Sequence, residues 1–292
     1  MKNKDYVIIT DSCSDMTSDM VKEVDVKIIP MVFRIDGKDY FDYPDDRDMS
    51  SHDFYEMLRN NKKSTTAQIN PSTYLEFLKK YLEKGEDILL VVFSSALSST
   101  YNSALIALET LKDNYPNRKI MIIDSLSAAG GQGYLVYKLG LNRMKGMSLQ
   151  DNFAWGEKNK LNIAHWFTID DLMYLNRGGR LSAGKAWMGT LLTLKPVLHV
   201  DEMGRLIPMA NVRGRKQALI ALYNKFKENA TNPKENLVII SHADDINDAK
   251  FLGKKIQENF DVPKIIYTNI GPVIGSHVGA NAILLFFMAK NR

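Results

Sequence analysis

Cysteine is almost absent from this chain of 292 residues, in which Cys13 is the single example. One cysteine cannot form an intramolecular disulfide, and without a second cysteine or a CxxC pair there is no thiolate metal site. The fold therefore depends on neither a disulfide framework nor a zinc cluster. Such sparing use of cysteine is typical of a reducing compartment.

Long hydrophobic runs are also missing. The longest apolar stretch, Ala282 to Ala289, is far shorter than the ~20 residues with which a helix crosses a bilayer. Near the N-terminus, the charged segment Met1 to Asp5 is followed only by the short stretch Val7 to Thr10, which cannot form the core of a signal peptide. We expect a cytoplasmic protein without a transmembrane segment.

Charge of one sign is in only slight excess, since lysine and arginine number 38 and the acidic residues 34. The excess is spread along the chain, and no basic run of the kind that binds nucleic acid is present. GxxxxGK[ST] is absent, and the glycine-rich segment 271–279 lacks GxGxxG spacing, so nothing supports a nucleotide site. The remaining composition, 45% hydrophobic and 25% charged, is that of a globular protein.

Short β-rich runs alternate with amphipathic helical stretches in the first half of the chain. The helix predicted from Pro71 to Glu83 starts with proline and repeats apolar residues at helical spacing. This alternation predicts an α/β fold whose N-terminal part is a mostly parallel sheet with helices on both faces. The predicted strands are Tyr6 to Thr10, Val26 to Phe33, Ile88 to Phe93 and Lys119 to Ile123.

The pattern starts again after a polar helix predicted from Ser148 to Lys160. We place a boundary near Lys158, between an N-terminal α/β domain (1–158) and a C-terminal α/β domain (159–292), and expect a ligand between them. Gly204 suits a hairpin turn, so the C-terminal sheet is predicted to be mixed. The predicted strands of this half are Asn162 to Ile169, Pro196 to Val200, Leu206 to Met209, Asn236 to Ser241 and Lys264 to Thr268.

A dense group of hydroxyls follows the third predicted strand, because Ser94 to Thr100 contains four serines and a threonine. Ligands of open α/β sheets collect at the carboxyl ends of strands. At the start of the next helix, unpaired N–H groups and the helix dipole favour an anion. The segment is a candidate site for a carboxylate or a phosphate. Alternatively, one or two of these serines only cap the helix that runs through Ala104 and Leu108.

A second candidate segment, Gly271 to Gly279, is predicted to be a loop before an apolar helix, Ala282 to Met288. Glycine allows a ligand to approach the backbone closely, and His277 can donate a hydrogen bond to an oxyanion. A lone histidine is more often a packed or solvent-facing residue.

Catalysis by a serine hydrolase is the opposing hypothesis. Ser95 or Ser98 would be the nucleophile, His277 the base and Asp11 the orienting acid. However, neither serine lies in a GxSxG nucleophile elbow. Asp11 and Asp15 directly follow the first strand, where aspartate most often has a turn or cap role, although a metal ligand or base stays open.

Six motifs, taken in chain order, resemble those of the DegV family, and they extend from the first predicted strand to the last helix. The motifs are Thr10-Asp11-Ser12 with Asp15, Thr65-Thr66-Ala67-Gln68, Ser94 to Ala104, Asp124-Ser125, Asp170 to Leu175 with Gly178-Gly179-Arg180, and Gly271 to Gly279. The resemblance implies a two-domain protein that binds a long-chain fatty acid between its domains, without catalysis, cofactor or metal. It also implies a partner, because members in many bacteria present the fatty acid to a separate ATP-dependent fatty acid kinase, which forms the acyl phosphate.

The resemblance also implies roles for single residues. The carboxylate would be held by hydroxyl and histidine side chains and by the Ala96 N–H, Arg180 would brace the headgroup loops, and Arg213 would face the kinase. The implied ligand-binding residues are Thr66, Ser95, Ala96, Gly275, Ser276 and His277.

The chain departs from the family pattern at several positions. Ala67 stands where the family usually has serine, Ser99 where it has glycine, and Ala280-Asn281 where it has Pro-Gly. The loss of a hydroxyl at Ala67 and the added Cβ at Ser99 leave the headgroup geometry and the preferred chain length open. Tunnel walls are expected from the apolar run Ala282 to Met288 and from Trp187, Met188, Leu191 and Leu192.

Overall fold

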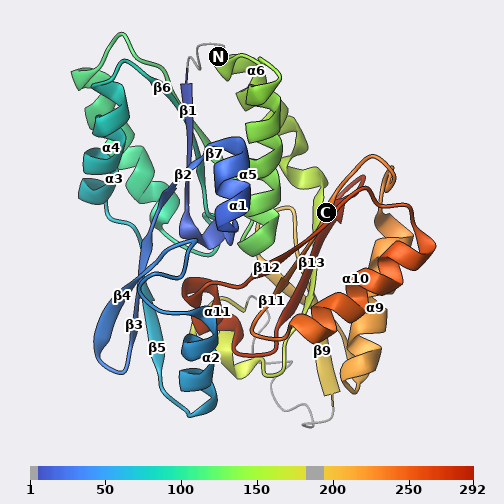
Figure 1. The fold of residues 1–292 in the computed structure, drawn as a ribbon. Coiled ribbons are helices and arrows are strands. Elements are labelled where there is room, and N and C mark those ends of the chain that lie inside the picture. The colour runs from blue at the N-terminus through green and yellow to red at the C-terminus, as the bar shows by residue number, and fades with distance from the viewer. Residues whose placement is uncertain (1–5, 182–193) are drawn as a thin grey trace.

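The computed structural model describes residues 6–181 and 194–292, which form an α/β fold around three sheets (Figure 1). The expected tunnel-wall residues Trp187, Met188, Leu191 and Leu192 lie outside the described residues. Among the described helices, none combines the length and the apolar character of a membrane span.

The N-terminal sheet has four strands in the order β2-β1-β6-β7, and all its pairings are parallel. Helices α3 and α4 cover one face, and α1, α5 and α6 cover the other (Figure 1). Because both faces are covered, its strands read as continuous apolar runs, and the prediction of a parallel sheet is confirmed. The elements are β1 (Tyr6–Asp11), β2 (Lys27–Ile29), β6 (Asp87–Val92), β7 (Ile120–Asp124), α1 (Ser18–Val24), α3 (Pro71–Leu82), α4 (Thr100–Asn114), α5 (Ala129–Met144) and α6 (Leu149–Asn159).

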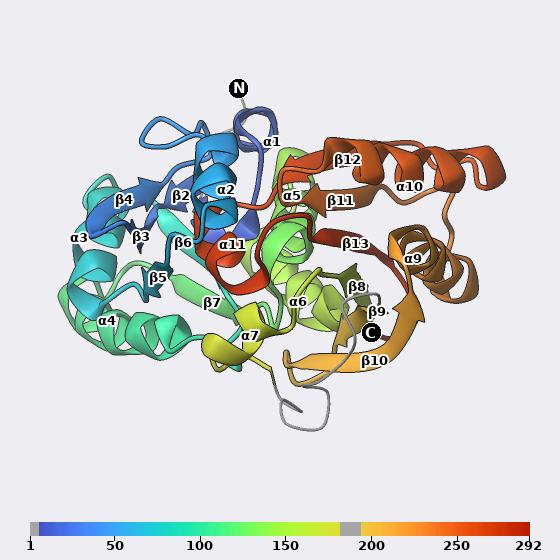
Figure 2. The same cartoon turned by 90° about the horizontal axis from the view of Figure 1, so that it is seen from below.

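The C-terminal sheet has the order β10-β9-β8-β13-β11-β12 and is mixed as predicted, because only β11 and β12 pair in parallel. Strands β9 and β10 form the predicted hairpin, in whose turn Gly204 has a φ of +76°. Helices α9 and α10 lie on the outer face, whereas α5 packs on the inner face (Figure 2). The elements are β8 (Ile163–Thr168), β9 (Leu194–Val200), β10 (Leu206–Arg213), β11 (Val238–His242), β12 (Ile265–Asn269), β13 (Ile283–Met288), α9 (Arg215–Asn229) and α10 (Ile246–Asn259).

A small antiparallel sheet, β4-β3-β5, was not predicted. The single strand predicted from Val26 to Phe33 is wrong, because Pro30 has no N–H for a sheet ladder and divides the run. The part before Pro30 is strand β2, which pairs with β1 in the N-terminal sheet. The part after Pro30 belongs to strand β3, which pairs with β4 and β5 in the small sheet. The elements are β3 (Met31–Ile35), β4 (Lys38–Asp42), β5 (Ser64–Ala67) and the neighbouring α2 (Ser51–Arg59).

Two predictions for the C-terminal segment are also wrong. The expected loop is helix α11 (Pro272–Val278), which Pro272 starts at a position where its missing N–H costs nothing. The expected helix is strand β13, which lies between β8 and β11. Five of its six residues are buried, so the run lacks the alternation that marks a half-exposed strand. The remaining elements of the described residues are η1 (Ser12–Ser14), η2 (Lys160–Asn162) and α7 (Met173–Arg177).

Candidate functional site

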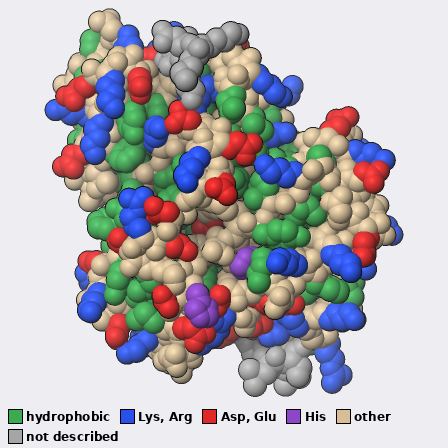
Figure 3. Space-filling model, in the orientation of Figure 1, with side chains coloured by type: hydrophobic (Ala, Val, Ile, Leu, Met, Phe, Trp, Pro, Cys, Tyr) green, Lys and Arg blue, Asp and Glu red, His purple; other side chains and the backbone are tan. Residues whose placement is uncertain are grey.

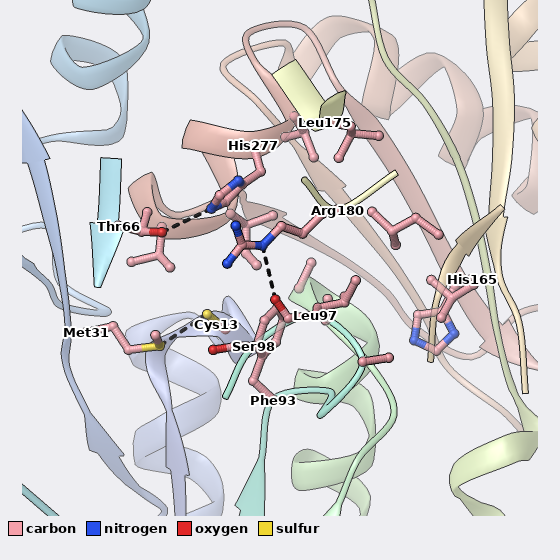
Figure 4. Close-up of a pocket in the computed structure, with 18 of the residues that line it drawn as sticks. Cys13, Met31, Thr66, Phe93, Leu97, Ser98, His165, Leu175, Arg180 and His277 are labelled. Carbon is pink, nitrogen blue, oxygen red and sulfur yellow. Dashed lines mark hydrogen bonds between the residues drawn. The ribbon is translucent and has the colours of Figure 1, made fainter. Parts of the chain in front are cut away.

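A cavity of about 440 Å³ lies where the three sheets meet, and residues from both halves of the chain line it. This volume falls within the ~300–1,000 Å³ of small-molecule sites. Most of the lining is apolar, and the polar side chains lie mainly at one end, as Figure 4 shows for Thr66, Arg180 and His277. The large apolar lining residues are Met31, Phe93, Leu97, Phe167, Leu175, Val200, Leu206, Val273, Ile274, Val278, Leu284 and Phe286.

Thr66 and His277 meet at the polar end of this cavity. Thr66 Oγ1 on β5 lies 3.0 Å from His277 Nε2 on α11, and a hydrogen bond of 2.7 Å between Ser64 Oγ and Ser276 Oγ also ties these elements together. Burial, and then the nearby charge of Arg180, lowers the pKa of His277 to about 4. The ring is therefore neutral near pH 7. Its Nδ1 atom is buried and has no hydrogen-bond partner in the described part of the chain.

Arg180 brings a positive charge to the same end. Its Nε donates to the carbonyl oxygen of Leu97 at 3.1 Å, and its Nη1 donates to that of Gly178. Within residues 6–181 and 194–292, no acidic side chain forms an ion pair with it. A Cβ at Gly178 would overlap His277 Nδ1, so this glycine is what allows the ring to pack on the α7 segment.

The hydroxyls of the serine-rich turn Ser94 to Thr100 fall into two groups: some form hydrogen bonds within the protein, and others face the cavity without a partner. Ser94 Oγ donates to the carbonyl oxygen of Gly204 at 3.0 Å, and Ser98 Oγ accepts the Thr100 N–H at 3.2 Å, at the start of α4. In the described residues, the hydroxyls of Ser95 and Ser99 have no hydrogen-bond partner, and both residues line the cavity. Ser98 therefore bonds the first residue of α4, whereas the N-cap residue Ser99 makes no side-chain cap bond. The hydroxyls of Ser95 and Ser99 are free to contact a ligand.

The structure does not bring every predicted site residue to this cavity. Gly275 and Ser276 are on α11 but do not line it, and a Cβ at Gly275 would lie 2.6 Å from the Tyr55 hydroxyl oxygen. Arg213 is exposed at the far end of β10 from Leu206, which does line it. Ala96 lines the cavity, and its N–H donates to Ser94 Oγ at 3.3 Å.

The residues of the hydrolase hypothesis do not form a triad. The Asp11 carboxylate accepts hydrogen bonds from the N–H groups of Cys13 and Phe93 and from the side chain of Gln132. It is not bonded to His277, whose Nδ1 has no orienting acid among the described residues. Asp11 has the turn and cap role that the sequence favoured.

Two features of the site were missed by the sequence reasoning. His165 lines the end opposite Thr66 (Figure 4), where its Nε2 contacts the Ser127 hydroxyl. Strand β8 is buried throughout, so no pattern of exposed and buried positions marks this histidine. A neighbouring cavity of about 710 Å³ shares Thr66, Arg180 and His277 with the first. Lys62, Lys63 and Arg177 also line it, and among its described lining residues Asp171 is the one acid.

Charged side chains of both signs are mixed over the face shown in Figure 3. In the described residues, one group of three potential metal ligands converges at the surface, namely His52, Glu56 and Asp244. The Arg59 guanidinium already binds both carboxylates of this group, at 2.8 and 2.5 Å. The group is an ion-pair cluster.

Known proteins match the chain over almost its whole length. The sequence profile of the DegV family, described as a family of uncharacterised proteins, matches residues 5–290. A DegV domain-containing protein of Clostridium perfringens is 38% identical over 289 residues, which cover 99% of each chain.

Two solved structures share the fold. One is a DegV family protein from Thermus thermophilus that is described as binding fatty acid. Its TM-score is 0.88, and its sequence is 26% identical, with 97% of this chain and 99% of that chain covered. The other is DegV, a fatty acid binding protein from Bacillus subtilis, with a TM-score of 0.84 and 25% identity over 98% and 99%. Because the family profile matches residues 5–290 and a family member that is 38% identical covers 99% of the chain, this chain belongs to the DegV family.

Proposed function

We propose that this protein binds one long-chain fatty acid, with the tail in the 440 Å³ cavity, and that it has no catalytic activity of its own. The observation that carries the proposal is Arg180, a half-buried cation without an acidic partner in the described residues, at the polar end of a mainly apolar cavity. A partly buried charge favours a counter-ion, and an apolar cavity favours a hydrocarbon. A fatty acid supplies both.

The carboxylate would lie among Thr66, Ser95 and His277. Each can donate a hydrogen bond to an oxygen of the headgroup, and neutral imidazole still has one N–H to give. The Ala96 N–H can exchange its long bond to Ser94 Oγ for the carboxylate. These donors keep the buried carboxylate from being left unpaired, which would cost several kcal/mol.

The tail would supply most of the affinity. Burial of a chain of about sixteen carbons at ~0.8 kcal/mol per CH₂ gives roughly 12 kcal/mol before ordering costs. The wall residues come from both sides of the boundary that we place near Lys158, so the bound lipid would join domains 1–158 and 159–292. The fatty acid binding described for the relatives from Thermus thermophilus and Bacillus subtilis supports this assignment.

Fatty acid titration of delipidated protein tests the proposal. We expect Thr66→Val and Ser95→Ala each to weaken binding about 10- to 100-fold, because a hydrogen bond to a charged group contributes ~1.5–3 kcal/mol. Thr110→Val, an exposed hydroxyl on α4 outside this cavity, is the matched control. Unchanged affinity in both cavity variants would contradict the assignment of the headgroup.

We further propose that the bound fatty acid is presented to a separate fatty acid kinase, which phosphorylates its carboxylate. The 710 Å³ cavity supports this step, because Thr66 and His277 also line it and because, among its described lining residues, the basic side chains outnumber the one acid, Asp171. Phosphate binds lysine and arginine well. The exposed Arg213 would contact the kinase, away from the lipid.

A reconstituted mixture of lipid-loaded protein, a fatty acid kinase and ATP tests presentation by its yield of acyl phosphate. Arg213→Ala should lower the yield and leave fatty acid affinity unchanged. Lys112→Ala, an exposed cation on α4, serves as the control and should lower neither. Equal yields with the two variants would remove Arg213 from the partner surface, and no yield with the wild-type protein would contradict presentation itself.

A further inference from the structure

A third cavity, of about 170 Å³, shares no described lining residue with the lipid cavity, the 440 Å³ cavity in which we propose that the fatty acid tail lies. It lies between η1, the end of β4, the segment that leads to α2, and the turn between β12 and α11. The face of Figure 3 is hollowed near its centre, and acidic side chains lie beside the hollow. Three carboxylates line the cavity, those of Asp15, Asp42 and Asp46, together with serine, threonine and asparagine side chains. Its described lining contains no lysine, arginine or histidine.

Two of the three carboxylates are buried and incompletely bonded. Asp15 is 7% exposed and Asp42 is 6% exposed, and the Oδ2 atom of each has no hydrogen-bond partner in the described residues. Asp15 Oδ1 accepts the Gly271 N–H at 3.0 Å. A Cβ built on Gly271 would lie 2.9 Å from both oxygens of Asp42 and 3.1 Å from Asp15 Oδ1, so the two carboxyl groups converge.

A buried pair of this kind needs positive charge. An unpaired carboxylate loses several kcal/mol of hydration when it is buried, and two at close range also repel each other. Either bound protons or a bound cation can relieve this cost.

The chemistry of the lining favours a cation. Carboxylate, hydroxyl and amide oxygens are the ligands of hard divalent cations, and Mg²⁺ in particular is usually held by one or two carboxylates while it keeps several waters. The cavity is far larger than a bare ion, and it has room for such a hydrated ion. Asp46, which accepts hydrogen bonds from the Ser51 N–H and hydroxyl, is the third acidic group at its wall.

We infer that this cavity binds a hydrated divalent cation of the Mg²⁺ type, with Asp15 and Asp42 as its carboxylate ligands. Because Asp15 also accepts the N–H of Gly271, directly before α11, the cation fixes the start of the helix that carries His277. The cation site therefore supports the polar end of the lipid cavity through α11. The cation site does not depend on which ligand the lipid cavity binds.

Calorimetric titration of the full chain, freed of metal by a chelator, tests the site with MgCl₂ and, separately, CaCl₂. We expect saturable binding of one ion per chain. Asp15→Asn and Asp42→Asn should weaken it about 10- to 100-fold or more, since even outer-shell groups change metal affinity by that factor. Asp113→Asn, the same change at an exposed aspartate of α4, should bind like the wild type.

Circular dichroism of each variant shows whether it is folded, and if Asp15→Asn fails to fold, Asp42→Asn decides alone. The absence of saturable binding of either ion to the wild-type protein would overturn the site and leave the pair to be neutralised by protons. Equal affinity in the wild type and in folded Asp42→Asn would also overturn it.

Discussion

At the scale of single residues, the polar end of the lipid cavity depends on a few side chains that differ in what they already bind. Thr66 contacts His277, and Arg180 donates to backbone carbonyls. The Ser95 hydroxyl has no hydrogen-bond partner among the described residues, although the Ser95 N–H donates to Asp124 Oδ1 at 3.2 Å. These groups can change partners when a carboxylate arrives, whereas Ser94 and Asp11 are fully engaged in the backbone of the turns. The two sets therefore respond differently to substitution.

The histidine predicts a pH effect on stability. The pKa of His277 is lowered from 6.5 to about 4, so between these values the unfolded chain binds a proton that the folded chain does not. Acidification over this window favours unfolding. Delipidated wild type should therefore lose stability relative to His277→Gln as the pH falls from 7 to 4.5, as measured by urea unfolding at each pH.

The buried carboxyls Asp11 and Asp42, whose pKa values are raised to about 6 and 7, change the stability with pH in the direction opposite to His277. They bind protons more readily in the fold, which gains stability from them as the pH falls. Both proteins contain them, so their effect cancels in the comparison. Parallel pH profiles for wild type and variant would mean that His277 is not held neutral by the fold.

Sequence reasoning found the residues whose chemistry is local. The hydroxyls of Ser94 to Thr100 lie at a strand-to-helix turn, which the alternation of elements predicts, and Thr66, Ser95, Ala96 and His277 all line one cavity. His165 could not be found in this way, because it faces the cavity from a fully buried strand. Neither could the convergence of Asp15, which follows η1, and Asp42, the last residue of β4, because the two meet only in the tertiary fold.

At the scale of elements, α5 joins the two larger sheets, and its glycines set how closely they approach. Gly131 faces β8, and a Cβ there would overlap the His165 ring. Gly131→Ala should therefore lower the free energy of unfolding by ~1–3 kcal/mol, the usual cost of overpacking. Denaturant unfolding of the single variant measures this loss.

A double-mutant cycle separates that clash from the intrinsic helix preference of alanine. His165→Ala removes the ring, so the double variant should lose less stability than the sum of the two single losses, by more than ~0.5 kcal/mol. Strictly additive losses would show that α5 and β8 do not meet through this pair.

Helix α3 was predicted from its proline start and its helical spacing, and the strands of the N-terminal sheet from short apolar runs that alternate with helices. Strands β1, β6 and β7 and helix α3 lie close to their predicted bounds. Strand β13 was predicted as a helix because an apolar run buried on both sides has no period of its own. The departure at Asn281 has a structural explanation. Asn281 stands where the family usually has glycine, and its φ of +63° is a backbone angle that asparagine tolerates better than most residues.

At the scale of the whole molecule, one lipid would contact the walls contributed by both halves of the chain. A ligand that binds only the folded state stabilises it by about 2.7 kcal/mol when its free concentration is 100 times Kd. We therefore expect delipidated protein to gain roughly 5 °C in Tm on addition of excess palmitate. Scanning calorimetry with and without the lipid measures the gain, and an unchanged Tm would contradict tight binding in the folded state.

Native mass spectrometry of freshly purified protein, followed by denaturation and identification of the released molecule, shows whether this chain buries one long-chain fatty acid. We expect an added mass of one fatty acid per chain, which is released on unfolding. A chain that carries no lipid, both as purified and after incubation with a panel of fatty acids, would contradict the claim.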